Sequence, residues 1–167
     1  GVRLVGSEMC IRDRAYMDTH EGRLPIQDGI DVMTVGGVAF KRYLEIAQTL
    51  NKATAVVTDN DGNIEAVKKK YKEYEEIPCI HICVDNVVDT GDLKLSNKDF
   101  NYNTLEPKIL KENGREVMNN IFGTNYNTDD EMHKYMHAHK TDCAIAIFES
   151  ATKIKYPEYI MRAIKNE

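Results

Sequence analysis

The chain has 167 residues, which is enough for one domain, or for one domain with an appendage. Its hydrophobic fraction of 42% and charged fraction of 29% are ordinary for a soluble globular protein, and no apolar run approaches the roughly 18 residues of a membrane span. The net charge of −5 excludes a global attraction to nucleic acid, although local lysines and a bound metal would still supply a positive field. There is no signal-peptide pattern, and the four cysteines lack zinc-ligand spacing, so we expect a cytoplasmic protein with reduced thiols and no membrane partner.

The first fourteen residues, GVRLVGSEMCIRDR, differ in character from the rest. The peptide SEMCIRDR resembles a translated sequencing-adapter fragment. On this interpretation residues 1–14 are a non-native segment and residues 15–167 are the domain itself. The alternative is that VRLVG is a short genuine strand followed by Glu8.

Strands alternate with helices in the first half of the chain. The patterns predict a polar surface loop at Ala15–Asp28, a strand at Ile30–Val35, a tight Gly36-Gly37 turn, a helix from Val38 to about Leu50, a buried strand at Ala53–Val57, a charged helix from Asn63 to about Tyr74, and a buried strand at Ile77–Val84 that holds a buried His81. Helices then dominate, beginning near Lys108 and continuing over Glu116–Phe122, Asp129–His139, Cys143–Glu149 and Glu158–Lys165. This order predicts an α/β fold, with a parallel sheet flanked by helices and a mostly helical C-terminal half.

Asp59 and Asp61 follow the buried run ATAVV and lie one residue apart in the segment Asp-Asn-Asp-Gly. In an open α/β sheet the ligand site lies outside the carboxyl ends of the strands, where we expect this segment. Two carboxylates about 4 Å apart repel by roughly 1 kcal/mol in water and by about 4 kcal/mol in a partly buried site, so a divalent cation between them explains the pair. Oxygen ligands favour Mg²⁺ or Mn²⁺ over zinc. The alternative from these residues alone is an ordinary polar turn.

Five segments occur in the order seen in the overcoming lysogenization defect (OLD) family of nucleases: VMTVGGVAFKRYLEIAQTL, AVVTDNDG, NTLEPKIL, YMHAHKTDCAIAIFES and YPEYIMRAI. From about Ala15 to Glu167 the chain resembles the C-terminal Toprim domain of that family. The resemblance implies a Toprim (Rossmann-like) fold and metal-dependent cleavage of DNA phosphodiesters, which is the activity of an endonuclease.

The resemblance also implies roles for individual residues. Asp59 and Asp61 match the DxD motif that holds Mg²⁺ or Mn²⁺, and Lys140 matches a lysine that meets the scissile phosphate. Glu106, in TLEP, falls where the family often has an acidic residue near the metals. The family further implies DNA and an ATPase domain as partners, and a homodimer in the full-length protein.

The chain departs from the Toprim pattern at its start. Toprim domains carry a glutamate at the end of an inner first strand, in a VEG-like motif, and no such segment precedes Ala15, since Glu8 in LVGSEM does not match. A Walker A motif is also missing from the sequence. We therefore expect an N-terminally truncated fragment that lacks the first strand and has little or no nuclease activity on its own.

Two other functions remain open from the sequence. One is a different Mg²⁺-dependent phosphoryl-transfer enzyme in which Asp59 is the nucleophile, and a trapped phospho-aspartate would indicate it. The other is a non-catalytic module that binds DNA or a partner, and binding without cleavage that survives Asp61→Ala would indicate it.

Overall fold

A parallel pair of strands forms the sheet of the computed structural model, which describes residues 7–35 and 39–165. Strand β1 (Thr54–Thr58) pairs with β2 (Ile80–Val84), with Thr54 opposite Ile80 and Thr58 opposite Val84. The connection between the two strands consists of helix α3 (Ile64–Tyr71) and the short 3-10 helix η2 (Lys72–Tyr74). Both predicted strands and the helix between them are therefore present, but the prediction that the first strand is buried is wrong, since the residues of β1 are half-buried or exposed.

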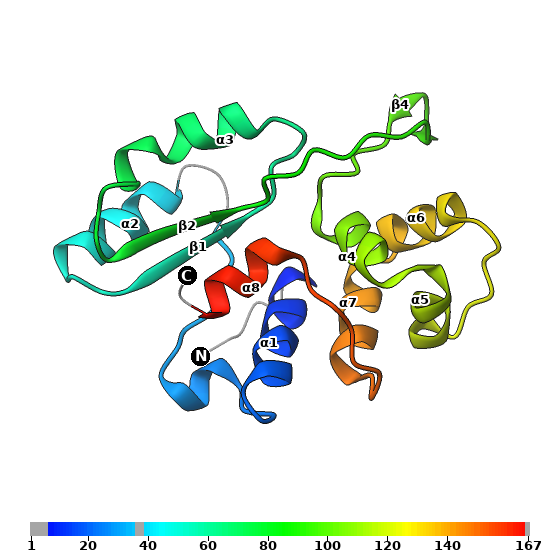
Figure 1. Cartoon of the computed structure of the whole chain (residues 1–167), viewed down its shortest axis with the longest axis horizontal. Helices are drawn as coiled ribbons and strands as arrows, with labels where there is room; N and C mark the ends of the chain where they lie inside the picture. Colours follow the sequence, from blue (N-terminus) through cyan, green and yellow to red (C-terminus); the bar gives the residue numbers. More distant parts are fainter. Residues whose placement is uncertain (1–6, 36–38, 166–167) are drawn as a thin grey trace.

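Helices cover both faces of this sheet, as predicted. Helix α2 (Ala39–Thr49) and α3 lie on one face, where Leu44 and Tyr71 pack against Ile80 in a hydrophobic cluster. Helix α8 (Glu158–Lys165) lies on the other face and contacts both strands (Figure 1). Because side chains alternate along a strand, the two faces have separate apolar contacts. The prediction of a buried His81 is wrong: the imidazole is exposed near the end of the face that α8 covers.

The segment predicted as a surface loop at Ala15–Asp28 is largely helical. Helix α1 (Ser7–Thr19) continues through Ala15 and Tyr16, both of which are buried, and the short 3-10 helix η1 (Pro25–Asp28) follows. The segment was predicted as a loop because its composition is polar. The few apolar residues of α1 nevertheless pack against other helices, and these tertiary contacts stabilise the helix. Ile11 and Ala15 lie in the main core, and Arg14 donates to the carbonyls of Phe148 and Ser150 at 2.7 and 2.6 Å.

The strand predicted at Ile30–Val35 is absent, since these residues have no regular secondary structure. Ile30 and Met33 are exposed, so this mostly apolar, β-branched sequence does not form a buried strand. A strand needs a hydrogen-bonded neighbour, and a local sequence pattern cannot provide one. The predicted Gly36-Gly37 turn lies outside the described residues.

The second half of the described chain is helical, as predicted. It begins with a small hairpin of β3 (Lys94–Leu95) and β4 (Lys98–Asp99), whose two turn residues both have positive φ angles. The helices are α4 (Leu105–Asn113), α5 (Arg115–Phe122), α6 (Asp129–Ala138), α7 (Lys140–Glu149) and α8. A capping box, in which Thr128 accepts from the amide of Glu131 and Glu131 accepts from that of Thr128, explains where α6 begins.

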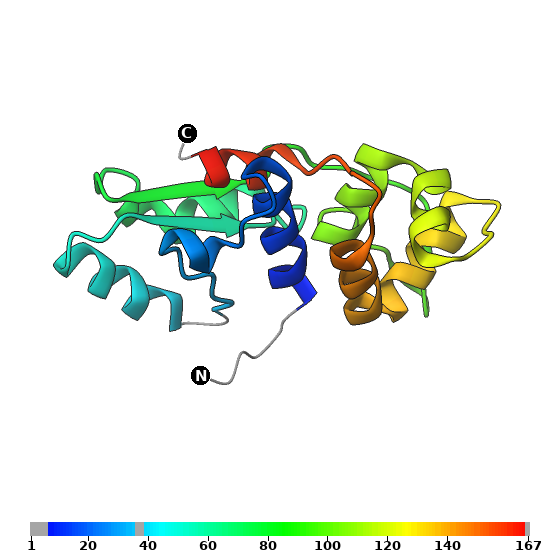
Figure 2. The ribbon, with the colours of Figure 1, turned by 90° about the horizontal axis from the view of Figure 1, so that it is seen from below.

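Helices α1 and α8 lie between the sheet and the helices α4 to α7 (Figure 1 and Figure 2). Figure 2 shows α1 beside α8 on one side and α7 on the other, and α1 packs extensively against α7. The main hydrophobic core contains residues of α1, α4, α5, α6, α7 and α8, with Val57 of β1 packed against it. Within the described residues, the helices are too short or too polar for any of them to cross a membrane.

Candidate functional site

The loop that follows β1 carries the two predicted carboxylates. Asp59 is half-buried, and its Oδ1 accepts a hydrogen bond from the Tyr159 hydroxyl at 2.7 Å. Asp61 is exposed, has a left-handed backbone conformation with φ of 48°, and accepts from the Asn101 amide at 3.3 Å. The loop therefore lies at the carboxyl end of β1, as the sequence predicted, and its two carboxylates are supported by different parts of the chain.

Asn60, between the two aspartates, ties the loop after β1 to the loop after β2. Its side chain is fully buried, and its amide donates to the carbonyls of Asp85 at 3.0 Å and Val87 at 2.8 Å. Its own side-chain oxygen accepts from the amide of Gly62 at 2.8 Å. Both the NH₂ group and the oxygen of the Asn60 side chain therefore have protein partners. These hydrogen bonds fix the loop after β1 relative to the loop after β2.

Lys108 supplies a cation to the same region from the first half of α4. Its ammonium lies 2.8 Å from Asp85 Oδ2, 2.7 Å from the carbonyl of Val87 and 2.5 Å from Asp89 Oδ2, and the residue is only 5% exposed. Burial opposes ionisation of Asp89, but hydrogen bonds from Lys108 and Lys111 outweigh it and lower the pKa of Asp89 below its ordinary value. The loop after β2 is thus organised around an internal positive charge.

Glu106 and Lys140 form an ion pair, with 3.2 Å between Lys140 Nζ and Glu106 Oε2. Glu106 lies in the first turn of α4 and is 7% exposed, whereas Lys140 is the first residue of α7. The structure therefore brings these two predicted residues together. Glu106 follows Asn101, the partner of Asp61, by a few residues along the same segment.

The three predicted carboxylates, those of Asp59, Asp61 and Glu106, do not come together as one metal-binding group in the described part of the chain. Among the described residues, no group of three or more His, Cys, Asp or Glu side chains is arranged to hold a metal ion. The donor set of Asp59 and Asp61 nevertheless fits Mg²⁺ or Mn²⁺ chemically, because Mg²⁺ commonly binds one or two carboxylates and completes its shell with water and substrate phosphate. Glu106 has a lysine as its partner instead, so its assignment as a metal ligand stays a prediction.

Tyr159 is a site residue that the sequence analysis did not predict. Burial raises the pKa of its hydroxyl, and the neighbouring charge of Asp59 raises it further, so the hydroxyl stays protonated and donates to that carboxylate. Asn60, Asn101 and Lys108 were also missed. Their partners lie in other elements, so the sequence around them indicated little. The local signals were that Asn60 lies between two aspartates and that Lys108 belongs to the segment LEPKIL.

Comparison with protein families gives a match in the first part of the chain. Residues 12–61 match the model described as "Overcoming lysogenization defect protein-like, TOPRIM domain". The match runs from α1 to Asp61, so it includes Asp59 and Asp61 and stops before Glu106 and Lys140. No curated protein and no solved structure matches the chain.

A TOPRIM match indicates, in general terms, a protein that binds metal and processes nucleic acid. The α/β architecture, with a parallel two-stranded sheet between helices, is consistent with it. The match also begins inside the segment predicted to be non-native. Residues 7–14 form the first part of α1 there, and the origin of residues 1–14 stays a prediction.

Proposed function

We propose that this chain is the metal-binding part of a DNA endonuclease of the OLD type, with Asp59 and Asp61 as the ligands of Mg²⁺ or Mn²⁺. The observation that carries the proposal is the pair itself: two carboxylates on one loop at the carboxyl end of a parallel strand, within the segment that matches the TOPRIM model. The ATPase domain and the homodimer implied by the resemblance are part of the same proposal.

In this proposal, different residues have separate roles around a bound DNA phosphate. A bound divalent metal would supply an activated water and neutralise charge on the phosphate. Tyr159 orients Asp59 by donating a hydrogen bond to its Oδ1. Asn101 does the same for Asp61. In this proposal Lys140 binds the phosphate as a point charge. Glu106 holds the Lys140 ammonium while DNA is absent.

The test is metal binding measured directly, by electron paramagnetic resonance of Mn²⁺ titrated into the chain. We expect Asp59→Asn and Asp61→Asn each to weaken Mn²⁺ binding at least tenfold, because each removes a charged ligand and keeps an acceptor for Tyr159 or Asn101. Asp92→Asn is the matched control, since Asp92 is exposed in another loop. Equal Mn²⁺ binding in the wild type and both loop variants would contradict the proposal.

Nuclease activity and DNA binding need a separate measurement. With Mn²⁺ present, Lys140→Ala should weaken binding of a labelled DNA duplex several-fold, with Lys134→Ala as the control on the exposed part of α6. Nicking of supercoiled plasmid that Asp59→Ala abolishes would support the endonuclease and overturn the expectation that this chain alone is nearly inactive. If the wild type and Lys140→Ala bind DNA equally well with Mn²⁺ present, Lys140 does not contact the DNA phosphate.

A further inference from the structure

The outer edge of β2 presents unpaired backbone groups. In a parallel ladder alternate residues bond to the same neighbour, and Thr54 N donates to the carbonyl of Cys79 at 2.8 Å. It follows that His81 and Cys83 face β1, whereas Ile80, Ile82 and Val84 direct their amides and carbonyls outward. The Arg162 guanidinium supports this register, since it donates to the outward carbonyl of Val84 at 2.6 Å.

Part of this edge is already satisfied within the chain. The amide of Ile80 donates to the carbonyl of Ile77 at 2.9 Å, and the carbonyl of Val84 is taken by Arg162. Within residues 7–35 and 39–165, the carbonyl of Ile80, both backbone groups of Ile82 and the amide of Val84 have no protein partner. An edge strand with such groups is a template for pairing with another chain.

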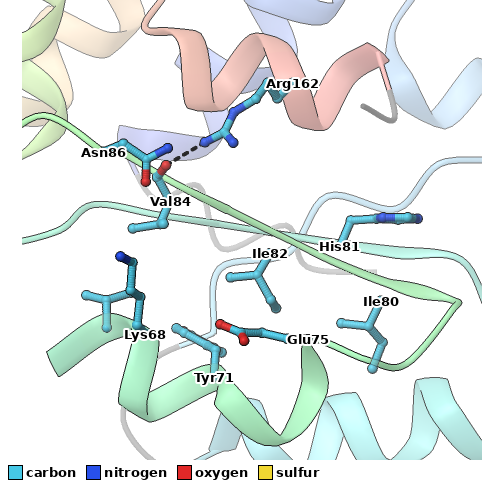
Figure 3. Close-up of a pocket in the computed structure, with 10 residues that line it drawn as sticks. Lys68, Tyr71, Glu75, Ile80, His81, Ile82, Val84, Asn86 and Arg162 are labelled. Carbon is cyan, nitrogen blue, oxygen red and sulfur yellow. Dashed lines mark hydrogen bonds between the residues drawn. The ribbon is translucent and has the colours of Figure 1, made fainter. Parts of the chain in front are cut away.

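A hollow of about 290 Å³ runs along this edge, between α3 and the end of α8 (Figure 3). Val67 and Tyr71 of α3, with Ile80 and Ile82, form its apolar wall. Small-molecule pockets are typically about 300–1,000 Å³, so this hollow suits one or two side chains of an extended peptide better than a whole ligand.

The charges along the hollow are uneven. Lys68 and Arg162 lie near Val84 and Asn86, at the carboxyl end of β2, whereas Glu75 lies nearer Ile80 and Ile82 (Figure 3). Lys68 is exposed, and among the described residues its ion pair is a 3.5 Å contact with Glu65, whose side chain is even more exposed, so Lys68 can accept a new anionic partner. A peptide that carries negative charge at this end and an apolar side chain in the hollow matches the groove.

We propose that the outer edge of β2 binds an extended acidic peptide segment of a partner protein, which adds to the sheet as a third strand. Its backbone pairs with Ile82 and with the free groups of Ile80 and Val84, and its acidic residues lie against Lys68 and Arg162. Strand addition of this kind draws affinity from main-chain hydrogen bonds and specificity from alternate side chains. The proposal is independent of the metal site, which lies in the loop after β1.

The test uses synthetic peptides and fluorescence anisotropy. The probe is a labelled octapeptide of alternating valine and threonine that ends in two aspartates. We expect it to bind, and to lose affinity at least tenfold when alternate amides are N-methylated, because methylation removes donors while the side chains remain. A version that ends in two lysines should also bind at least threefold more weakly.

Two protein variants locate the binding. Lys68→Glu should weaken the aspartate peptide several-fold and restore binding of the lysine peptide, with Lys72→Glu as the matched control outside the hollow. Ile82→Pro removes one outward amide and spares the β1 ladder, which uses His81 and Cys83. Circular dichroism confirms that the variants are folded, and the amide resonances of Ile82 and Val84 in nitrogen-15 spectra should shift on binding.

Several outcomes overturn the proposal. If the N-methylated peptide binds as tightly as the unmodified one, the peptide does not add to the sheet as a strand. Absence of binding by the aspartate peptide at millimolar concentration would contradict the proposal as well. Sedimentation could instead show dimers that form at higher concentration and are lost in Ile82→Pro. The strand that pairs with the outer edge of β2 would then come from a second copy of the chain. Displacement of the peptide by a DNA duplex, with Lys68→Glu weakening the duplex alone, would make the edge a nucleic-acid surface.

Discussion

Lys108 is the residue on which the loop after β2 depends. Its ammonium contacts two carboxylates and a carbonyl within 2.8 Å, at a position that is almost fully buried. Removing one partner of a buried ion pair leaves the other charge uncompensated, which is why such changes cost far more than surface ones. Asn60 bonds to the same carbonyl of Val87, so a disturbance here reaches the loop that carries Asp59 and Asp61.

Lys108→Met should therefore lower the free energy of unfolding by about 3–5 kcal/mol, because the methionine fills the space but takes the Lys108 cation away from Asp85 and leaves Asp89 with the exposed Lys111 alone. Urea unfolding measures it. Lys111→Met is the control: its ammonium also contacts Asp89, at 2.6 Å, but its side chain is 53% exposed, so the loss should stay below about 1 kcal/mol. Equal losses in the two variants would show that burial of the Lys108 ion pair is unimportant.

The candidate site was only partly predictable at this scale. Asp59 and Asp61 come directly after an apolar strand sequence that stops at two carboxylates, and that local pattern was enough to place them at the end of β1. Lys108 and Asn60 act through partners in other elements. A lysine within a helical sequence normally indicates a solvated face, and nothing local distinguishes one that meets two carboxylates in a neighbouring loop.

At the scale of elements, prediction worked where the local pattern and the packing agree. Strands β1 and β2 and helices α5 to α8 were placed within a few residues, since each has its own periodicity or terminating residues. Helix α1 was missed because its stability comes from contacts with α7 that no local pattern encodes. Ile30–Val35 was over-predicted for the converse reason: its composition is typical of a strand, but it pairs with no strand of the described residues.

Helix α6 contains a buried histidine that ties it to the segment after the β3–β4 hairpin. The His133 ring lies 5.1 Å from the Phe100 ring and 5.2 Å from the Tyr102 ring, centroid to centroid, and its Nδ1 is buried with no hydrogen-bond partner among the residues that the structure describes. Burial lowers the pKa of His133, and the charges of Asp129 and Asp130 oppose this only in part. The contact between α6 and this segment therefore favours the neutral imidazole.

Stability should consequently fall as the pH drops below about 6.5, where an unfolded histidine begins to bind its proton. Between that value and the lower pKa of folded His133, the unfolded state binds more protons, so the free energy of unfolding falls by up to about 1.4 kcal/mol per pH unit. Urea unfolding from pH 7 to pH 5 measures the slope. His133→Leu should flatten it, whereas His137→Leu, at an exposed position of α6, should not. A slope unchanged in His133→Leu would assign it to other groups.

At the scale of the whole molecule, the described residues form two hydrophobic clusters, one on each face of the sheet. The smaller lies between the sheet and helices α2 and α3, and the larger joins α1 and α8 to the helices α4 to α7. Helix α8 belongs to the larger cluster and also contacts both strands. Its hydrogen bonds from Tyr159 to Asp59 and from Arg162 to Val84 fasten it across the carboxyl end of the sheet. The site loop is thus built where the two halves of the molecule meet.

If α8 joins the sheet and the helices α4 to α7 into one cooperative unit, a cavity beneath α8 should lower the stability of both parts. Ile160 is 1% exposed within the larger cluster, and Ile160→Ala should lower the free energy of unfolding by about 2–5 kcal/mol. Hydrogen exchange should then show faster exchange of amides in β1 and β2 as well as in α7, with Ile145→Ala, at an exposed position of α7, as the control. Loss of protection in α7 alone would mean that the sheet and its site loop fold independently of the helical half.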